Sequence, residues 1–180
     1  MNNAIGVYTF QCFTHEQVKE INKRSKKNIL RKEKQTNVAS NASKIGEFSI
    51  VPCVPLMELI HPWLYQCQQA NKKLFGFDIH WDFHLDTLNY NVYGINGEYK
   101  WHVDANDENT PNDMKLTCLL NLSEELYEGG EFYTINSNEK HEFTSGMGLI
   151  CNSLIAHKVT PVTKGERITL TYWAYGLSWR

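Results

Sequence analysis

The sequence predicts a mainly β fold with supporting helices, in which a double-sheet jelly roll carries the helices on one outer face. From Phe77 onward the chain is a series of short strand-like segments separated by turn residues. Helical periodicity is confined to two regions before Phe77, and there is no internal repeat. A chain of 180 residues is expected to form a single domain. Residues 1–78 would supply an opening strand, the helices and a loop, and residues 79–176 the β core.

The first helical region begins with a capping signal. Residues 5–13 are expected to form an opening strand, and Thr14 then stands where a helix N-cap is needed. Gln17, three residues later, occupies the reciprocal position of a capping box. We expect this helix to end near Ser25.

The second helical region starts at Pro55 and ends at a glycine. Apolar residues recur there with a spacing of three or four, and Pro62 interrupts the pattern. A proline inside a helix predicts a kink or two short helices. Gly76 is a natural stop. We expect both helical regions to pack together against one face of a sheet.

Residues 26–48 are polar and show no clear period, which predicts a long loop. Loops of this length often act as lids or binding loops. The overlapping segment 23–44 holds eight Lys or Arg residues and one acid, so the rest of the chain has ten basic and nineteen acidic residues. Either this basic segment favours an acidic partner or it is a plain solvated loop.

Alternation within the predicted strands separates polar from apolar faces. The expected strands span residues 79–93, 98–103, 115–122, 130–136, 147–151, 155–160 and 166–175. In the last strand one face carries Arg167, Thr169, Thr171, Trp173 and Tyr175. In the strand that ends at Tyr93, Asn89 and Asn91 share its face. We expect these polar faces to line the mouth of the β core.

One motif has the chemistry of a metal centre. His102 and Asp104 are two residues apart, which puts both on one side of an extended segment, and His157 follows 53 residues after Asp104. Two imidazoles and a carboxylate form the facial triad of non-haem ferrous oxygenases. A rival pair, His80 and Asp82, has a simpler interpretation as the start of a strand whose aromatic residues pack.

The ordered set of motifs from about Leu88 to Tyr175 resembles iron- and 2-oxoglutarate-dependent dioxygenases of the prolyl 4-hydroxylase type. The resemblance covers roughly half of the chain and implies a double-stranded β-helix. The residues that carry it are Tyr93, Tyr99, His102 and Asp104, the run Leu116–Leu122, Gly129-Gly130-Glu131-Phe132, the strand Gly146–Cys151, His157, and Arg167 with Thr169. An arginine ten residues after the second histidine makes this set specific.

The resemblance also implies roles for individual residues. His102, Asp104 and His157 would bind Fe(II), and Arg167 with Thr169 would bind the distal carboxylate of 2-oxoglutarate. The alternative for Arg167 is an ordinary ion pair with an acidic residue. The alternative for Tyr99, Trp101 and Trp173 is a role in packing only. Further contacts to the co-substrate are expected from Tyr93 and Asn121, and contacts to the substrate from Trp101, Trp173 and Tyr99.

The implied activity is hydroxylation of prolyl residues in a peptide or protein, with Fe(II), 2-oxoglutarate and O2, release of succinate and CO2, and ascorbate as a candidate reductant. A free amino acid or small metabolite is the alternative substrate. Nucleic-acid demethylases of the AlkB type carry a second arginine six residues after the first, where this chain has Trp173. A non-enzymatic jelly-roll binding module has no need of the triad together with Arg167.

Five widely spaced cysteines without a CxxC motif suggest reduced thiols. The chain begins without a secretory signal pattern and has no apolar run of about 18 residues, the length that a membrane span requires. We therefore expect a cytoplasmic protein without a membrane partner. The sequence does not predict the oligomeric state.

Overall fold

The computed structural model describes residues 6–35, 43–81, 86–106, 113–137 and 139–177. The helical elements are α1 (His15–Lys27), η1 (Val54–Leu56), α2 (Met57–Ala70), η2 (Asn71–Phe75) and η3 (Asp104–Asn106). The strands are β1 (Val7–Gln11), β2 (Arg31–Gln35), β3 (Lys44–Pro52), β4 (Ile79–His80), β5 (Thr87–Tyr93), β6 (Glu98–His102), β7 (Met114–Asn121), β8 (Glu128–Gly129), β9 (Phe132–Thr134), β10 (Met147–Asn152), β11 (His157–Val159), β12 (Val162–Lys164) and β13 (Arg167–Gly176).

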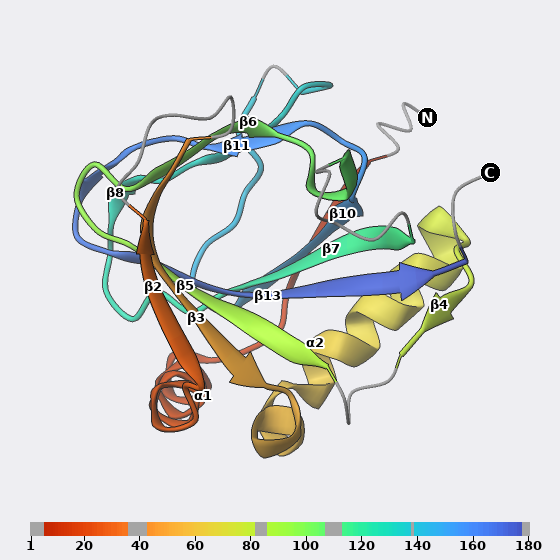
Figure 1. Ribbon diagram of the computed structural model, residues 1–180, viewed down its shortest axis with the longest axis horizontal. Helices are drawn as coiled ribbons and strands as arrows, with labels where there is room; N and C mark the ends of the chain where they lie inside the picture. Colours follow the sequence, from red (N-terminus) through yellow and green to blue (C-terminus); the bar gives the residue numbers. More distant parts are fainter. Residues whose placement is uncertain (1–5, 36–42, 82–85, 107–112, 138, 178–180) are drawn as a thin grey trace.

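Two antiparallel sheets share strand β3, which confirms the predicted jelly-roll architecture. The larger sheet has the order β1-β10-β7-β13-β5-β3, with β2 beside β3 and β4 beside β13. Residues 47–52 of β3 pair with β5, whereas Lys44 and Ile45 pair with β6 of the smaller sheet, β6-β11-β9. Figure 1 shows the smaller sheet facing the larger one, with the ribbon of β8 and β12 at one side. The inner faces of the two sheets enclose the candidate site.

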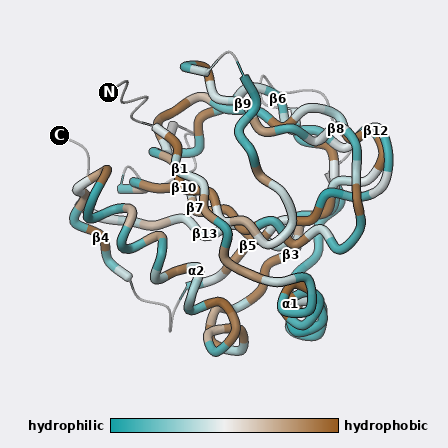
Figure 2. Tube along the Cα trace, turned by 180° about the vertical axis from the view of Figure 1, so that it is seen from behind, coloured by the Kyte–Doolittle hydropathy of each residue, from teal (hydrophilic) through white to brown (hydrophobic). Residues whose placement is uncertain are grey.

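Both long helices cover the outer face of the larger sheet, as predicted (Figures 1 and 2). Val18 and Ile21 of α1, and Trp63 and Leu64 of α2, are completely or almost completely buried. They share one core with the outward-facing side chains of the sheet, which include Leu88, Leu116, Leu120, Leu170 and Tyr172. Burial of apolar surface therefore fixes the sheet against the helices. In the part of the chain that the structure describes, no helix has the length and apolar character needed to cross a membrane.

The helix ends follow the predicted signals closely. The Thr14 hydroxyl accepts from the backbone N–H of Gln17, and the Gln17 side chain accepts from the backbone N–H of Thr14, which completes the capping box. Gly76 ends the second helical region in the left-handed conformation at φ 71°. Pro62 lies inside one continuous helix, α2, so of the two predicted outcomes the division into two short helices is wrong. The buried apolar face of α2 offsets the backbone hydrogen bond that proline cannot donate.

The predicted long loop over residues 26–48 is also wrong. Residues 31–35 form strand β2, which pairs with residues 46–50 of β3, and α1 extends to Lys27. Residues 36–42 lie outside the described residues. Strand β2 has side chains such as Arg31, Lys32 and Lys34 exposed to solvent. Both of its faces are polar, so the alternation that marks most strands is missing from its sequence.

Other strands also differ from the predicted bounds. The expected strand over residues 79–93 is divided into β4 and β5, and residues 82–85 lie outside the described part of the chain. The rival metal residues Asp82 and His84 belong to that segment, whereas His80 is exposed in β4 beside Tyr175 of β13. The short ribbon of β8 with β12 was not anticipated.

The shared core predicts a large difference between two leucines. Leu120 is completely buried in this core, whereas the side chain of Leu126 is almost fully exposed. Replacing Leu120 with alanine should lower the free energy of unfolding by about 2–5 kcal/mol. Leu126→Ala is the control and should change it by about 0.5 kcal/mol or less. Urea unfolding followed by circular dichroism measures both, and equal effects would contradict the packing described here.

Candidate functional site

Strands β6 and β11 bring two histidines together from distant parts of the sequence. The two strands are antiparallel neighbours, and His157 lies directly opposite His102. The imidazole rings are 4.1 Å apart between centroids and meet edge to face. Asp104 follows β6 at the start of the short helix η3. Strand pairing therefore places the two histidines together, and the turn after β6 adds Asp104 as a third potential metal ligand.

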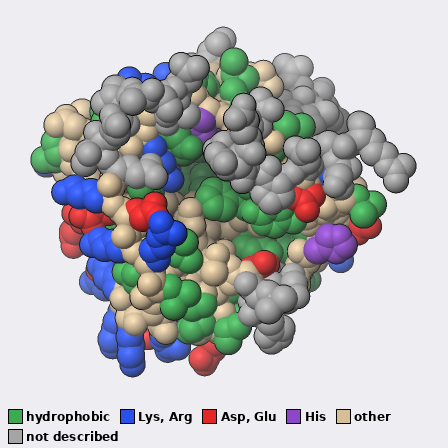
Figure 3. All heavy atoms as spheres, viewed as in Figure 1, with side chains coloured by type: hydrophobic (Ala, Val, Ile, Leu, Met, Phe, Trp, Pro, Cys, Tyr) green, Lys and Arg blue, Asp and Glu red, His purple; other side chains and the backbone are tan. Residues whose placement is uncertain are grey.

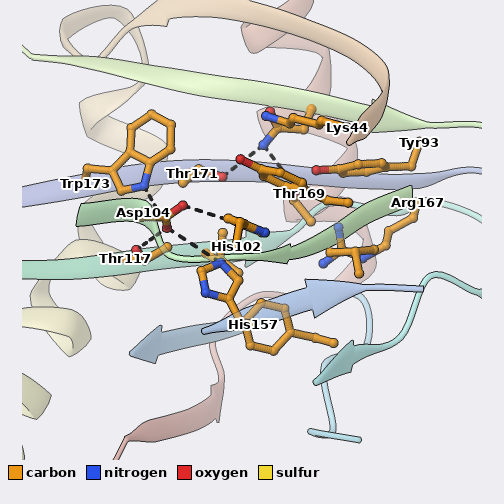
Figure 4. A pocket seen from close by; sticks show the side chains of 15 residues that line it. Lys44, Tyr93, His102, Asp104, Thr117, His157, Arg167, Thr169, Thr171 and Trp173 are labelled. Carbon is orange, nitrogen blue, oxygen red and sulfur yellow. Dashed lines mark hydrogen bonds and ion pairs between the residues drawn. The ribbon is translucent and has the colours of Figure 1, made fainter. Parts of the chain in front are cut away.

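The three side chains converge as metal ligands do. Asp104 Oδ1 lies 3.4 Å from His102 Nε2, and Asp104 Oδ2 lies 3.7 Å from His157 Nε2. One ligand atom from each residue lies within 4.8 Å of the others, and Figure 4 shows the three side chains pointing toward one another. Among the described residues, no other cluster of His, Cys, Asp and Glu has this geometry. All three residues line a cavity, and a non-haem Fe(II) site requires such space beside its ligands.

Hydrogen bonds fix the state of both imidazoles. Nδ1 of His102 lies 2.7 Å from the carbonyl oxygen of Lys100, and Nδ1 of His157 lies 2.9 Å from that of Ile155. A carbonyl oxygen only accepts, so each Nδ1 carries a proton, and in a neutral ring Nε2 is then the atom that can bind a metal. Carbonyl groups that orient metal-binding histidines in this way are a common feature of metal centres. The donor set therefore fits a divalent ion.

Asp104 is held as an anion by its surroundings. Thr117 on β7 and Trp173 on β13 are cross-strand partners, and both donate to Asp104 Oδ2, at 2.5 Å and 3.2 Å. Burial by itself would raise the pKa of Asp104, but His102, His157 and the Thr117 hydroxyl outweigh it and hold the pKa below its usual value. Burial lowers the pKa of His157, against the opposing effect of Asp104. A carboxylate beside a neutral imidazole is the state in which these groups bind metals.

A β-bulge in β6 decides which aromatic side chains face the cavity. His157 pairs with His102 but Val159 pairs with Tyr99, so β6 has one extra residue in this interval. The extra residue puts Tyr99 and His102 on the same face, where their rings stack with centroids 3.3 Å apart. Trp101, expected to contact substrate, does not line this cavity. It is 43% exposed on the other face, beneath the ammonium of Lys158.

Arg167 is a buried cation that lacks hydrogen-bond partners for part of its guanidinium. The residue is 1% exposed, and its Nε and Nη2 form no hydrogen bond within the described part of the protein. The guanidinium carbon lies 5.3 Å from the ring centroid of Tyr93 and 5.6 Å from that of Phe143. Aromatic faces attract the charge but do not satisfy the N–H groups. These orphaned donors fit a bidentate carboxylate, such as the distal carboxylate of 2-oxoglutarate.

The cavity between Arg167 and the triad is lined as the alternation of β5 and β13 predicted. Asn91, Tyr93, Thr169, Thr171 and Trp173 all contribute to its wall, and Figure 4 shows the Tyr93 hydroxyl directed into it. Burial raises the pKa of Tyr93 to about 12, with a smaller opposing effect from Arg167, so this hydroxyl keeps its proton at neutral pH. The cavity thus presents a hydroxyl donor beside the guanidinium.

Asn121 does not reach the cavity, although we expected it to contact the co-substrate. Its amide nitrogen donates to the carbonyl of Phe143 at 2.7 Å and to the Tyr127 hydroxyl at 3.1 Å. Its oxygen accepts from the backbone N–H of Ser123 at 2.9 Å. The side chain is completely buried and its polar atoms are already paired. Asn121 therefore fixes the loop that carries Phe143, one of the two rings beside Arg167.

Lys44 lines the cavity, and sequence reasoning missed it. It was counted among the eight basic residues of segment 23–44, but the other seven lie on α1 and β2. Figure 3 shows that basic side chains gather over α1 and β2 on the outer surface. Lys44, in contrast, begins β3 and points into the cavity (Figure 4). Asn91, Thr117 and Thr171 line the cavity as well and were not singled out as site residues, although alternation placed Asn91 and Thr171 on polar faces.

Comparisons with known proteins agree with this geometry. Residues 88–175 match the family model of the 2OG-Fe(II) oxygenase superfamily. A PKHD-type hydroxylase of Alteromonas mediterranea is 39% identical over 93 residues, which cover 47% of this chain and 41% of that protein. A PKHD-type hydroxylase of Shewanella frigidimarina is 34% identical over 93 residues, with the same coverage. The chain therefore spans about two-fifths of the length of these relatives.

Solved structures share the fold over nearly the whole chain. A Pseudomonas putida prolyl-4-hydroxylase superimposes with a TM-score of 0.70 and 15% identity, covering 97% of this chain and 95% of the other. A viral collagen prolyl hydroxylase from Paramecium bursaria chlorella virus-1 gives a TM-score of 0.69 and 16% identity, covering 95% and 96%. These likenesses confirm the double-stranded β-helix. The matched segment, just under half of the chain, contains the triad and Arg167 and is similar to the 2OG-Fe(II) oxygenase superfamily.

Proposed function

We propose that this protein is an Fe(II)- and 2-oxoglutarate-dependent dioxygenase that hydroxylates prolyl residues in a peptide or protein. The observation that carries the first part is the pairing of two features in one cavity: a triad with two free Nε2 atoms, and a buried guanidinium with orphaned donors. A metal ion alone would not explain Arg167, and an anion site alone would not explain the triad. A keto acid that bridges the two accounts for both.

The chain's residues have distinct tasks in this proposal. Bound Fe(II) supplies the oxygen chemistry that side chains lack, with 2-oxoglutarate converted to succinate and CO2. His102, Asp104 and His157 would hold the metal, and Thr117 with Trp173 would orient the Asp104 carboxylate. Arg167 and the Tyr93 hydroxyl would bind the distal end of the co-substrate. Thr169 lies on the same strand face and is expected to assist.

The apolar residues that line the cavity would exclude water from the reaction. Leu119, Phe132 and Val159 also line the cavity and are buried. Exclusion of water strengthens the electrostatic interactions within such a site and limits side reactions. We propose that residues 79–176 form the catalytic core and that residues 1–78 support it within a single domain. A cytoplasmic location and a contribution of ascorbate also remain proposals.

The prolyl substrate is supported by relatives of this chain. Several structural neighbours are prolyl hydroxylases, and one from Trichoplax adhaerens was solved in complex with a peptide fragment of hypoxia inducible factor. Tyr99 and Trp173 line the cavity beside the triad and are the proposed substrate contacts, whereas Trp101 is not. Trp173 also occupies the position at which demethylases of the AlkB type carry an arginine, so nucleic acid is the less favoured substrate.

The triad predicts one tight site for a divalent ion. Purified protein should bind one equivalent of Mn(II), an inert substitute for Fe(II), in a calorimetric titration. Asp104→Ala should weaken this binding by about tenfold or more, since loss of even an outer partner of a metal ligand costs roughly 10–100-fold. His80→Ala is the control because His80 is exposed outside the cavity. If His80→Ala lost Mn(II) binding while Asp104→Ala kept it, the proposed metal ligands would be wrong.

The orphaned guanidinium predicts the co-substrate affinity. In Mn(II)-loaded protein, Arg167→Ala should weaken 2-oxoglutarate binding by about 100-fold, because truncating one partner of a buried charge pair costs roughly 2–5 kcal/mol. Thr169→Val should cost about 1 kcal/mol. Arg31→Ala, which changes a mostly exposed arginine on β2, should leave the dissociation constant unaltered. An unmoved constant in Arg167→Ala would show that the co-substrate binds elsewhere.

The substrate class can be tested with the Fe(II)-loaded enzyme. A panel of prolyl peptides, free proline and other amino acids is incubated with 2-oxoglutarate and O2. We expect succinate to form, and fragment mass spectrometry to find one added oxygen atom on proline within a peptide. Faster turnover of a free amino acid than of any prolyl peptide would refute the peptide substrate but not the oxygenase. Absence of succinate with every substrate would refute both.

A further inference from the structure

Lys44 is positioned by the first residues of β3. Lys44, Gly46 and Phe48 alternate along one face of this strand, and Lys44 at its start lines the cavity. A side chain at position 46 would press on Phe48, on Tyr93 and on the backbone of Val92, with contacts of 2.9–3.4 Å from its Cβ. The missing side chain lets Phe48 and Tyr93 pack edge to face with centroids 5.7 Å apart. Lys44 then lies over this aromatic layer.

The ammonium of Lys44 has aromatic contacts but no ionic partner. Its Nζ lies 3.7 Å from the ring centroid of Phe48 and 4.9 Å from that of Tyr99. Within the described residues it forms neither a salt bridge nor a hydrogen bond. Burial lowers the pKa of Lys44 to about 8, while Asp104 and Glu33 act in the opposite direction. The aromatic faces attract a cation but do not replace the water it has lost.

The charges that line the cavity do not balance. Asp104 is the one carboxylate among the lining residues, whereas Lys44 and Arg167 are both cations. A divalent ion and a dianionic 2-oxoglutarate would cancel one another, and Asp104 would cancel Arg167. The charge of Lys44 then remains. Lys44 is half-buried, and an uncompensated charge that is partly withdrawn from water attracts an anion, so a further anion would be stabilised there.

We infer that Lys44 forms a second anion subsite, which binds a carboxylate of the substrate next to the carbon that is hydroxylated. This inference rests on the proposed function, because the two carboxylates of 2-oxoglutarate are then already assigned to the metal and to Arg167. Tyr99, which contacts both Lys44 and the ring of His102, connects the subsite with the metal centre. The carboxylate belongs either to an acidic residue beside the proline or to a free amino acid.

Matched probes distinguish these two sources in protein loaded with Mn(II) and 2-oxoglutarate, which cannot turn over. The first pair is a prolyl pentapeptide with Asp or with Asn on both sides of proline, and the second pair is L-proline and L-prolinamide. Calorimetry should show that wild-type protein binds the carboxylate member of one pair about tenfold more tightly, the usual scale for one charge-assisted hydrogen bond. The discriminating pair identifies the source.

Substitutions then assign the preference to Lys44. Lys44→Met keeps the aliphatic contact with Phe48 and should remove the preference, whereas Lys44→Arg keeps the charge and should retain it. Lys158→Met is the matched control, since Lys158 also lies over aromatic rings, those of Trp101 and Tyr133, but outside the cavity. It should retain the preference. Thermal unfolding shows whether each variant is folded. The comparison of the two members of each probe pair in wild-type protein does not depend on any variant.

Three outcomes would overturn the inference. Equal affinity within both probe pairs in wild-type protein would show that no substrate carboxylate is recognised. A preference that survives in Lys44→Met would place the subsite on another residue. A dissociation constant for 2-oxoglutarate that weakens in Lys44→Met, with the probe preference unchanged, would assign Lys44 to the co-substrate. In all three cases Mn(II) and 2-oxoglutarate still bind to wild-type protein, whereas failure of that binding would refute the proposed function itself.

Discussion

The antiparallel pairing of β6 with β11 is the constraint on which the candidate site depends. It places His157 opposite His102, and the bulge in β6 turns Tyr99 to the same face as His102. A shift of one residue in this register would move the histidines to opposite faces of the small sheet. The position of Asp104 depends on the same pairing, because η3 follows directly from the end of β6.

The larger sheet stabilises this arrangement from the other side. Thr117 and Trp173 face each other across β7 and β13, and both donate to the same oxygen of Asp104. Those strands rest on a core that the helices close from outside. The metal ligands therefore come from the small sheet and the turn after it, whereas the groups that orient the carboxylate come from the large sheet. Rigid secondary structure on both sides holds a site more accurately than loops would.

Burial of charge explains the composition of the cavity. Arg167 lies between the rings of Tyr93 and Phe143, and Lys44 lies over those of Phe48 and Tyr99. Aromatic faces allow a cation to be buried without a permanent carboxylate beside it. An acidic residue in either place would neutralise the cation and remove its affinity for an anionic ligand. The cavity is thus left with cationic groups that remain available to ligands.

Local signals in the sequence determined much of the fold. The capping box of Thr14 and Gln17, the stop at Gly76 and the two-residue alternation of β5 and β13 each depend on neighbouring residues, and all were predicted. The resemblance of the ordered set His102, Asp104, His157 and Arg167 to a known family predicted which residues the structure brings to one cavity. Strand periodicity predicted only the side to which residues within one strand point.

The tertiary structure decided what local patterns do not encode. Strand β2 is polar on both faces and becomes a strand only by pairing with β3, so its sequence resembled a loop. Tyr99 lies on the same face as His102 because of a bulge that is visible only in the pairing of two strands. The side-chain amide of Asn121 donates to the carbonyl of Phe143, which lies in a loop more than twenty residues away. In the sequence Lys44 is one of eight basic residues in a polar segment. In the structure it points inward, because β3 crosses from one sheet to the other. Long-range pairing and burial set these positions, and neither is contained in the residues next to them.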